Sequence, residues 1–286
     1  MVMRRHPEKK YFLISVELAN EVGALSEVLR VLAIRELNIL EGYSCVKRKE
    51  REAVWSCVVE TKNPRMDTNF LRELLEGSDY VEKVEIEESH GGLIIDSLNF
   101  PVIWGGGERC VVLSSGFINQ SFEEAMVRFG EIASGFIYEI GTNYGSSVWA
   151  SAFGAAHEDI EASLREATKL LSASGVARAE VIDFNRDVPS VTFSLLDSFE
   201  CAKAESKVPH SHFVRGILCG AVSAAFKQNL KSVESECIAL GDKRCLVVVS
   251  PLTSASSESI GSGRSDQEGA SDSALAIPTH SFKLNR

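Results

Sequence analysis

The segment "ESECIALGDKRC" (residues 234–245) places two cysteines around a Gly-Asp turn, and it decides how the C-terminal half of the chain folds. Opposite residues of an antiparallel hairpin sum to a constant, so a three- or five-residue loop centred on Gly241 sets Cys237 against Cys245. A two-residue Gly-Asp turn would instead send the cysteines to opposite faces. Facing cysteines are compatible with half of a metal site, a disulfide or two core contacts, and the residues alone leave these three readings open.

A metal site at this hairpin needs further ligands, and the neighbouring sequence offers two kinds. "PHSHF" (residues 209–213) supplies His210 and His212 about one helix length upstream. Glu234 and Glu236 lie within three residues of Cys237, but both face away from it in an ideal strand. A bulge must therefore deliver either carboxylate to the cysteines. The CxxC pattern of a zinc ribbon is absent.

The segments before the hairpin predict an α+β domain with an antiparallel sheet and packed helices. "HSHFVRGILCGAVSAAFKQN" (210–229) predicts a helix whose small residues allow another helix or a ligand to approach closely. "ARAEVIDFN" (177–185) and "SVTFSLLDSF" (190–199) predict a strand pair, and "HEDIEASLREATKLLSAS" (157–174) predicts a helix. Further upstream we expect a strand over "RCVVLSS" (109–115) and a long helix capped by Ser121 in the "SFEE" box.

The N-terminal segment, residues 10–89, predicts the element order βαββαβ. Apolar residues alternate over residues 10–19 as in a strand, and residues 23–37 show helical spacing. Two strands around a charged turn, a second helix and a last strand follow, which is the split order of ferredoxin-like folds. We expect residues 90–108 to be a connector, residues 109–250 to be the second domain and residues 251–286 to be a disordered Ser/Gly-rich tail.

Composition limits the class of protein. The 286 residues are 44% hydrophobic and 24% charged, which is typical of a globular protein, and the net charge is −10. This negative balance argues against direct nucleic-acid binding. Apolar runs stay short of the ~20 residues that span a membrane, so no membrane association is expected. Seven scattered cysteines and a start that does not resemble a signal peptide predict a reducing, cytoplasmic setting.

The loop "ANEVGAL" (residues 19–25), followed by "LNI" (37–39), carries the most specific pattern of the first segment. With the βαββαβ order it resembles the ACT family of small-molecule regulatory modules. Gly23 permits a tight turn, and the next helix start offers unpaired amides that suit a carboxylate. The resemblance implies a bound amino acid or similar molecule at a dimer interface. The candidate contacts are Asn20, Gly23, Ala24, Leu25 and Asn38.

"HFVRGILCGAVSAAFKQNLKSVESECIALGDKRCLVVV" (residues 212–249) is similar to the 4-vinyl reductase domain family. That family includes the sensory domains of aromatic-responsive bacterial transcription activators, and the similarity extends over residues 109–145. Its metal-binding members imply a zinc ion held by a Cys before the helix, a Glu and two Cys. The last three correspond to Glu234, Cys237 and Cys245. Ser211 stands where the first Cys is expected, so the neighbouring His212, or else His210, is the predicted replacement.

Zinc with four protein ligands has no open position, so the predicted zinc is structural. Relatives that bind apolar or aromatic molecules imply a ligand chamber with Phe136, Tyr138, Trp149 and Phe213 among its walls. We therefore interpret the chain as a ligand-sensing regulator that forms a homodimer, has no catalytic residue and signals through a downstream protein partner. The alternative is a reductase or accessory enzyme for a vinyl-bearing tetrapyrrole, although no dinucleotide fingerprint is found. A third reading is a scaffold without a ligand.

Overall fold

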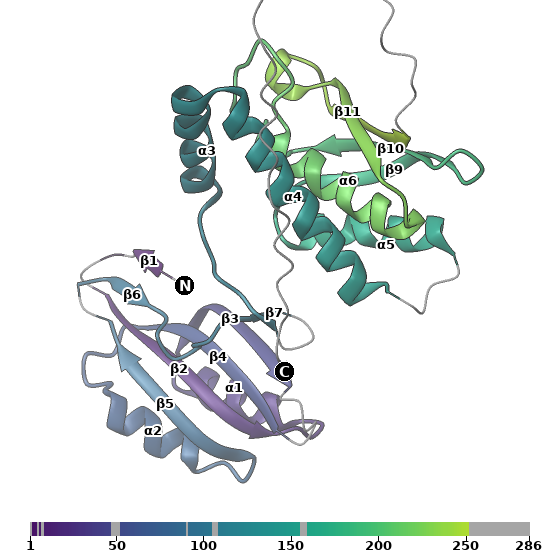
Figure 1. The fold of residues 1–286 in the computed structure, drawn as a ribbon. Coiled ribbons are helices and arrows are strands. Elements are labelled where there is room, and N and C mark those ends of the chain that lie inside the picture. The colour runs from purple at the N-terminus through teal and green to yellow at the C-terminus, as the bar shows by residue number, and fades with distance from the viewer. Residues whose placement is uncertain are drawn as a thin grey trace, which may run out of the picture. The chain divides into compact units, whose positions relative to one another are not determined.

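The computed structural model describes residues 2–4, 6, 9–46, 52–89, 91–104, 108–154 and 159–251, and the chain divides into two compact units. The first unit is Met1–Leu113 and the second begins at Ser114 (Figure 1). Each unit contains a four-stranded antiparallel sheet with helices, so the predicted α+β class is confirmed. The expected tail beyond Pro251 lies outside the described residues.

The first unit has the predicted βαββαβ order and a ferredoxin-like sheet. Its strands follow the order β3-β4-β2-β5, and all neighbours are antiparallel. Helices α1 and α2 pack against one face of this sheet. The elements are β2 (Lys10–Ala19), α1 (Ala24–Ile34), β3 (Asn38–Val46), β4 (Glu52–Thr61), α2 (Thr68–Glu76) and β5 (Val81–Glu88).

The other face of this sheet is covered by the segment that follows β5. Phe12 and Ile14 of β2 point into the helix-side core, while Tyr11 and Leu13 point to the opposite face and are buried as well. Ile94 of the short strand β6 (Leu93–Ile95) packs there, and β6 pairs with β1 (Val2–Arg4). Because both faces are covered, β2 is apolar almost throughout.

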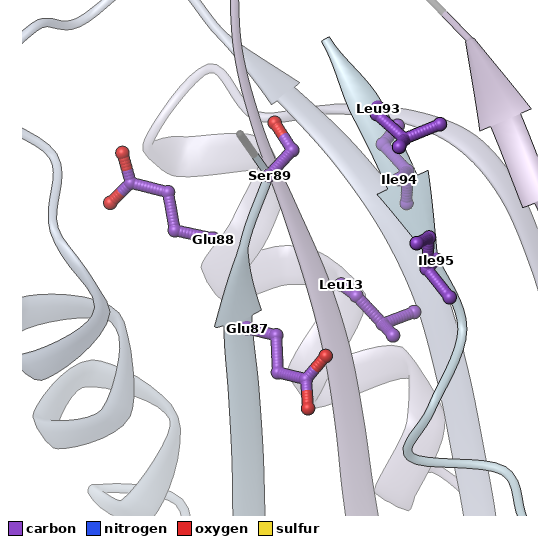
Figure 2. A pocket seen from close by; sticks show the side chains of 7 residues that line it. All are labelled: Leu13, Glu87, Glu88, Ser89, Leu93, Ile94 and Ile95. Carbon is purple, nitrogen blue, oxygen red and sulfur yellow. The ribbon is translucent and has the colours of Figure 1, made fainter. Parts of the chain in front are cut away.

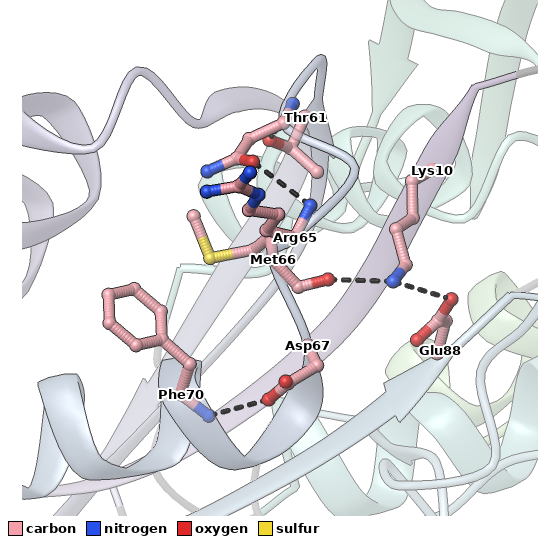
Figure 3. A network of polar contacts seen from close by, with 8 residues as sticks. Lys10, Thr61, Arg65, Met66, Asp67, Phe70 and Glu88 are labelled. Atoms are coloured by element: carbon pink, nitrogen blue, oxygen red, sulfur yellow. Dashed lines mark hydrogen bonds and ion pairs between the residues drawn. The ribbon is translucent and has the colours of Figure 1, made fainter.

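Lys10 ties the start of β2 to the start of α2 (Figure 3). Its Nζ donates to the carbonyl oxygen of Met66 at 2.6 Å and lies 3.1 Å from a carboxylate oxygen of Glu88 on β5. The next residue, Asp67, caps α2 by accepting from the amide of Phe70 at 2.8 Å. One lysine thus connects two strands and a helix end.

The structure corrects two expectations at the start of the second unit. The strand expected over residues 109–115 is limited to Arg109 in the short hairpin of β7 (Ile103–Trp104) and β8 (Glu108–Arg109), and residues 110–114 have no regular structure. The next helix begins at Ser115, not after Ser121, because Ser114 accepts from the amide of Phe117 at 3.3 Å and provides the cap. Ser121 lies inside the helix and donates to the carbonyl of Phe117.

The second unit packs its helices around the sheet β11-β12-β10-β9. Helix α6 contributes Val214, Ile217 and Leu218 to the core with Phe193 of β10 and Val247 of β12. The elements are α3 (Ser115–Phe129), α4 (Glu131–Ala152), α5 (Ile160–Ala173), β9 (Arg178–Asn185), β10 (Ser190–Leu196), α6 (His212–Phe226), β11 (Leu230–Glu236) and β12 (Cys245–Pro251). The short 3-10 helix η2 (Ile238–Leu240) lies between the last two strands.

Helices α4 and α6 lie in direct backbone contact, as the small residues of α6 predicted. A Cβ at Gly145 of α4 would lie 2.0 Å from the carbonyl oxygen of Ile217, and one at Gly141 would lie 2.2 Å from that of Phe213. A Cβ at Gly220 of α6 would lie 2.0 Å from the carbonyl oxygen of Thr142. Only glycine fits at these positions, so the position of α6 sets that of α4.

Candidate metal centre

The hairpin of β11 and β12 contains the bulge that the strand parity required. Glu234 pairs with Val247 and Glu236 pairs with Leu246, so Ser235 is an extra residue on β11. The extra residue reverses the alternation beyond it and turns Glu234 to the same side as Cys237. The loop between the strands holds η2 and Gly241, whose φ of 100° is left-handed.

Four buried side chains meet beside this hairpin: Cys201, Glu234, Cys237 and Cys245. Their ligand atoms all lie within 4.8 Å of one another. The three cysteines are 0% exposed and Glu234 is 5% exposed. Glu234 lies near the end of β11 and Cys237 directly follows this strand, while Cys245 begins β12 and Cys201 lies in the turn after β10.

The geometry of the cluster fits zinc. Two thiolates bound to one zinc ion at ~2.3 Å with tetrahedral angles lie roughly 3.8 Å apart. The Sγ atoms of Cys201 and Cys237 are 3.8 Å apart. Three thiols and one carboxylate also match the ligand chemistry of zinc and provide four donors, which is a closed set.

Hydrogen bonds position the ligand atoms. The amide and hydroxyl groups of Ser211 donate to the two carboxylate oxygens of Glu234. The same hydroxyl lies 3.4 Å from the Sγ of Cys201. The amide of Ile238 donates to the Sγ of Cys245 at 3.4 Å. Such outer contacts fix the direction in which a ligand atom points.

The cluster is also joined to the start of α6. Ser211 precedes this helix but makes no side-chain cap of its own. Glu200, next to Cys201, instead accepts from the amides of Phe213 and Val214 at 2.9 and 2.7 Å. Two buried carboxylates therefore satisfy amides that the first turn of a helix leaves unpaired.

Burial makes this region costly to ionise without a cation. It raises the pKa of Cys237 to about 11 and the pKa of Glu200 to about 8, although two backbone donors act in the opposite direction on Glu200. The hydrogen bond between Cys201 and Cys245, together with burial, raises the pKa of the Cys201 thiol, and the same bond lowers the pKa of Cys245. A divalent cation would take the place of the protons on the cysteines of the cluster.

Cys201, and neither histidine, is the fourth member of the cluster, which corrects the ligand predicted from "PHSHF". The rings of His210 and His212 lie 6.0 Å apart, and burial lowers the pKa of His212 to about 4. Ser211 does face the site, but it acts as a hydrogen-bond donor to Glu234. The available signal was that Cys201 is the nearest cysteine before α6, ten residues ahead of Ser211.

Three of the four predicted wall residues of the ligand chamber, Tyr138, Trp149 and Phe213, lie in or against one hydrophobic core, and Phe136 does not. Trp149 belongs to the core, whereas Phe136 is 68% exposed. The Tyr138 hydroxyl lies 3.0 Å from the Ser232 hydroxyl. Phe213 is the centre of an aromatic cluster, with ring centroids 6.0–6.3 Å from those of Phe122, Tyr144 and Phe199.

In the first unit, the predicted amino-acid contacts lie at two ends of the sheet. Asn20, Gly23, Ala24 and Leu25 follow the end of β2, where Ala19 pairs with Glu52. Asn38 pairs with Glu60, next to the pair that Lys10 at the start of β2 makes with Thr61. Within one chain these residues therefore do not share a site.

Two hollows lie among the described residues of the first unit, and neither is lined by residues of the Gly23 loop. One of about 260 Å³ is shown in Figure 2, where two strand segments face each other across it. It is lined by Leu13, Glu87, Glu88, Ser89, Leu93, Ile94 and Ile95. The other, of about 330 Å³, includes Asn38 between Arg35 and Lys62. Among the described residues, we find no helix that combines the length and the apolar character needed to cross a membrane.

Comparison with known protein families finds one match, which lies in the second unit. Residues 191–251 match the V4R domain family, and this segment contains all four residues of the cluster. No curated protein matches the chain.

Several solved structures are similar to part of this chain at low sequence identity. The phenol-responsive sensory domain of the transcription activator PoxR, solved with phenol, is 21% identical, with 52% of this chain and 79% of that one covered and a TM-score of 0.45. A vinyl-4-reductase family protein from Methanocaldococcus jannaschii is 18% identical, with 50% and 85% covered and a TM-score of 0.37. Trafficking protein particle complex subunit 3 from Naegleria fowleri, covalently bound to palmitic acid, is 13% identical, with 48% and 93% covered and a TM-score of 0.39.

Proposed function

We propose that this protein is a small-molecule-sensing regulator whose second unit contains a structural zinc ion. The buried cluster of Cys201, Glu234, Cys237 and Cys245 carries the proposal, because its donors and spacing suit zinc and leave no open position for substrate. The match of residues 191–251 to the V4R domain family supports a small-molecule-sensing role.

The proposed zinc ion joins three segments that are distant in sequence. It would hold the turn at Cys201, the end of β11 and the start of β12 in one place. Ser211 and Glu200 extend this connection to the first turn of α6. The ion therefore stabilises the helix that packs against both the sheet and α4.

The proposed ligand is a small apolar or aromatic molecule that contacts the aromatic cluster around Phe213. Rings from α3, α4, α6 and the segment after β10 meet there, and such rings bind a planar apolar molecule by stacking and edge contacts. Phe213 also donates its amide to Glu200, next to Cys201. A ligand at this position would contact the N-terminal end of α6, which the proposed zinc ion stabilises through Glu200 and Ser211.

For the first unit we propose an ACT-like role in which residues 10–89 bind an amino acid or similar molecule. The turn at Gly23 and the amides that begin α1 supply the carboxylate contact. Because Asn38 lies at the other end of the sheet, a complete site requires residues from a second copy of the chain. The proposed assembly is a homodimer in the cytoplasm that signals through a protein partner.

One experiment tests the sensor against the reductase alternative. We expect protein purified without added metal to carry one zinc per chain by elemental analysis, and mass spectrometry of an organic extract to detect a small apolar ligand. A flavin or nicotinamide absorbance in the purified protein, with turnover of a vinyl-bearing tetrapyrrole, would favour the enzyme. Zinc well below one per chain would overturn the metal site.

A further inference from the structure

Arg215 of α6 is a half-buried cation that has no partner for its hydrogen bonds among the described residues. Its side chain makes no ion pair and no hydrogen bond there, and its Nε is buried without an acceptor. Two other arginines of this unit are paired with carboxylates: Arg165 with Glu161 at 2.7 Å and Arg244 with Glu236 at 2.9 Å. In a chain with 40 acidic and 30 basic residues, an unpaired half-buried arginine needs a reason.

The Tyr138 ring holds the guanidinium of Arg215 in place. The Cζ of Arg215 lies over this ring, 5.3 Å from its centre, which is a cation–π contact. The hydroxyl of Tyr138 on α4 lies 3.0 Å from that of Ser232 on β11, so the ring is itself fixed. The ring offers no acceptor oxygen. Because Nε is the one nitrogen of this side chain that is buried and unpaired among the described residues, the two terminal nitrogens reach the surface, where a ligand can bind them.

The two buried carboxylates of this region have other partners. Glu200 accepts from two backbone amides of α6 at 2.9 and 2.7 Å. Glu234 accepts from Ser211 and belongs to the metal cluster. Neither forms an ion pair with Arg215 within the part of the chain that the structure describes. The acceptor that Arg215 lacks therefore has to come from outside the described residues.

His212 is a second donor next to Arg215. The two residues are three apart on α6, so their side chains are neighbours on one face. Burial, and then the charges of Arg215 and His210, lower the pKa of His212 to about 4. The imidazole is therefore neutral at neutral pH and offers one N–H without adding charge. Arg215 supplies a single full positive charge, which suits a monoanion better than a phosphate dianion.

We propose that Arg215 binds the carboxylate of a small organic acid, with the His212 imidazole as a second donor. A planar guanidinium and a carboxylate match in two parallel hydrogen bonds, and a carboxylate along the Nε edge gives that nitrogen its acceptor. We call Arg215, His212 and Tyr138 the α6 anion site. Residues two apart on a helix face different sides, so this site is separate from the aromatic cluster around Phe213. The inference goes beyond the proposed function and depends neither on zinc nor on the apolar ligand.

The test titrates the full chain with benzoate and with benzamide by isothermal titration calorimetry. The two molecules have the same ring, but only benzoate carries a charge, so the difference between them measures recognition of the carboxylate. We expect benzoate to bind at least about tenfold more tightly than benzamide. Inorganic phosphate is the third probe, and phosphate binding tighter than that of benzoate would overturn the assignment to a carboxylate.

Two substitutions assign the binding to Arg215. Arg215→Gln should weaken benzoate about tenfold or more and leave benzamide unchanged, because hydrogen bonds to a charged group are lost. Arg215→Lys keeps the charge without the planar fork, so it should also weaken benzoate. The lysine variant should retain zinc even if a positive charge here stabilises the metal cluster. The matched control is Arg244→Gln, which removes an arginine paired with Glu236 and should bind benzoate as wild type does.

Benzoate affinity that survives both substitutions at Arg215 would overturn the site. A wild-type protein that binds neither benzoate nor acetate at millimolar concentration would overturn it as well. If Arg215→Gln lost zinc while Arg215→Lys kept zinc and wild-type benzoate affinity, Arg215 would serve to balance charge at the metal cluster, and the proposal would be wrong. None of these outcomes concerns the zinc content of wild type or its extracted ligand, so they leave the proposed function standing.

Discussion

Replacement of Cys201 by serine is the sharpest test of the metal centre, because this residue joins the hairpin to the rest of the unit. Glu234, Cys237 and Cys245 all belong to the β11–β12 hairpin, so without Cys201 the ion would no longer connect the hairpin to the turn after β10. We expect Cys201→Ser to lose the zinc ion. The serine hydroxyl that replaces the thiol is a weak zinc ligand in a site built from thiolates.

The size of the effect follows from the stabilisation that a bound ion provides. With free metal at about a thousand times the dissociation constant, binding to the folded state contributes about 4 kcal/mol. Loss of that contribution should lower the melting temperature of the second unit by roughly 8–16 °C. Treatment of wild type with a chelator should produce a shift of similar size, and the variant should not respond to the chelator.

The assay combines thermal melting with elemental analysis of the same samples, and Cys219→Ser is the matched control. Cys219 is as buried as Cys201 but lies outside the cluster and donates to the carbonyl of Leu230, a contact that a serine hydroxyl keeps. This control should retain one zinc per chain. The reasoning fails if Cys201→Ser keeps stoichiometric zinc with wild-type melting, or if Cys219→Ser loses zinc to the same extent.

Three further predictions concern other parts of the molecule. His212→Gln should retain zinc, and in chelator-treated protein it should remove a loss of stability that wild type shows as the pH falls from 6.5 to about 4. The pKa of His212 is about 4 in the folded chain and lies below the unfolded value, so the unfolded chain binds more protons between pH 6.5 and 4. The free energy of unfolding should therefore fall by about 1–2 kcal/mol over that range, after allowance for partial exposure. If His212→Gln lost zinc, His212 would instead be a metal ligand. Gly145→Ala should lower the free energy of unfolding in denaturant by at least about 1–3 kcal/mol, because the methyl group overlaps the carbonyl of Ile217, and an unchanged midpoint would contradict the close helix contact. Gly23→Ala should destabilise the first unit by about 1 kcal/mol, because alanine is strained at the φ of 99° that Gly23 adopts. The new Cβ would meet no neighbouring atom, so backbone strain is the expected cause, and a more stable variant would refute it.

Most of the fold was predictable from local patterns. Alternation of apolar residues located β2, and helical spacing located α1 and α5. The start of α3 was not predictable in the same way, because Ser114 and Ser121 both suit a helix cap. Contacts beyond the segment, such as that of Phe122 with Phe213, decide which serine begins the helix.

The candidate site was predictable where its residues belong to one hairpin. The parity of an antiparallel pair predicted that Cys237 meets Cys245 and that Glu234 needs a bulge, and the register has that bulge. For the fourth residue, the position five residues before Gly216 led to Ser211 and its flanking histidines, whereas the cluster contains Cys201. The chain between β10 and α6 folds back, so Cys201 reaches the place where His212 was expected.

The sequence by itself determined the element order of the first unit, the β11–β12 hairpin and three members of the cluster, because these depend on backbone geometry over a few residues. Only the tertiary structure decided that Cys201 completes the cluster, that Asn38 lies away from the Gly23 loop, and that Ile132 and Phe136 of α4 remain exposed. Each of these depends on how long loops close between distant segments. How these loops close depends on the packing of the whole unit, and the spacing of residues within one segment does not predict it.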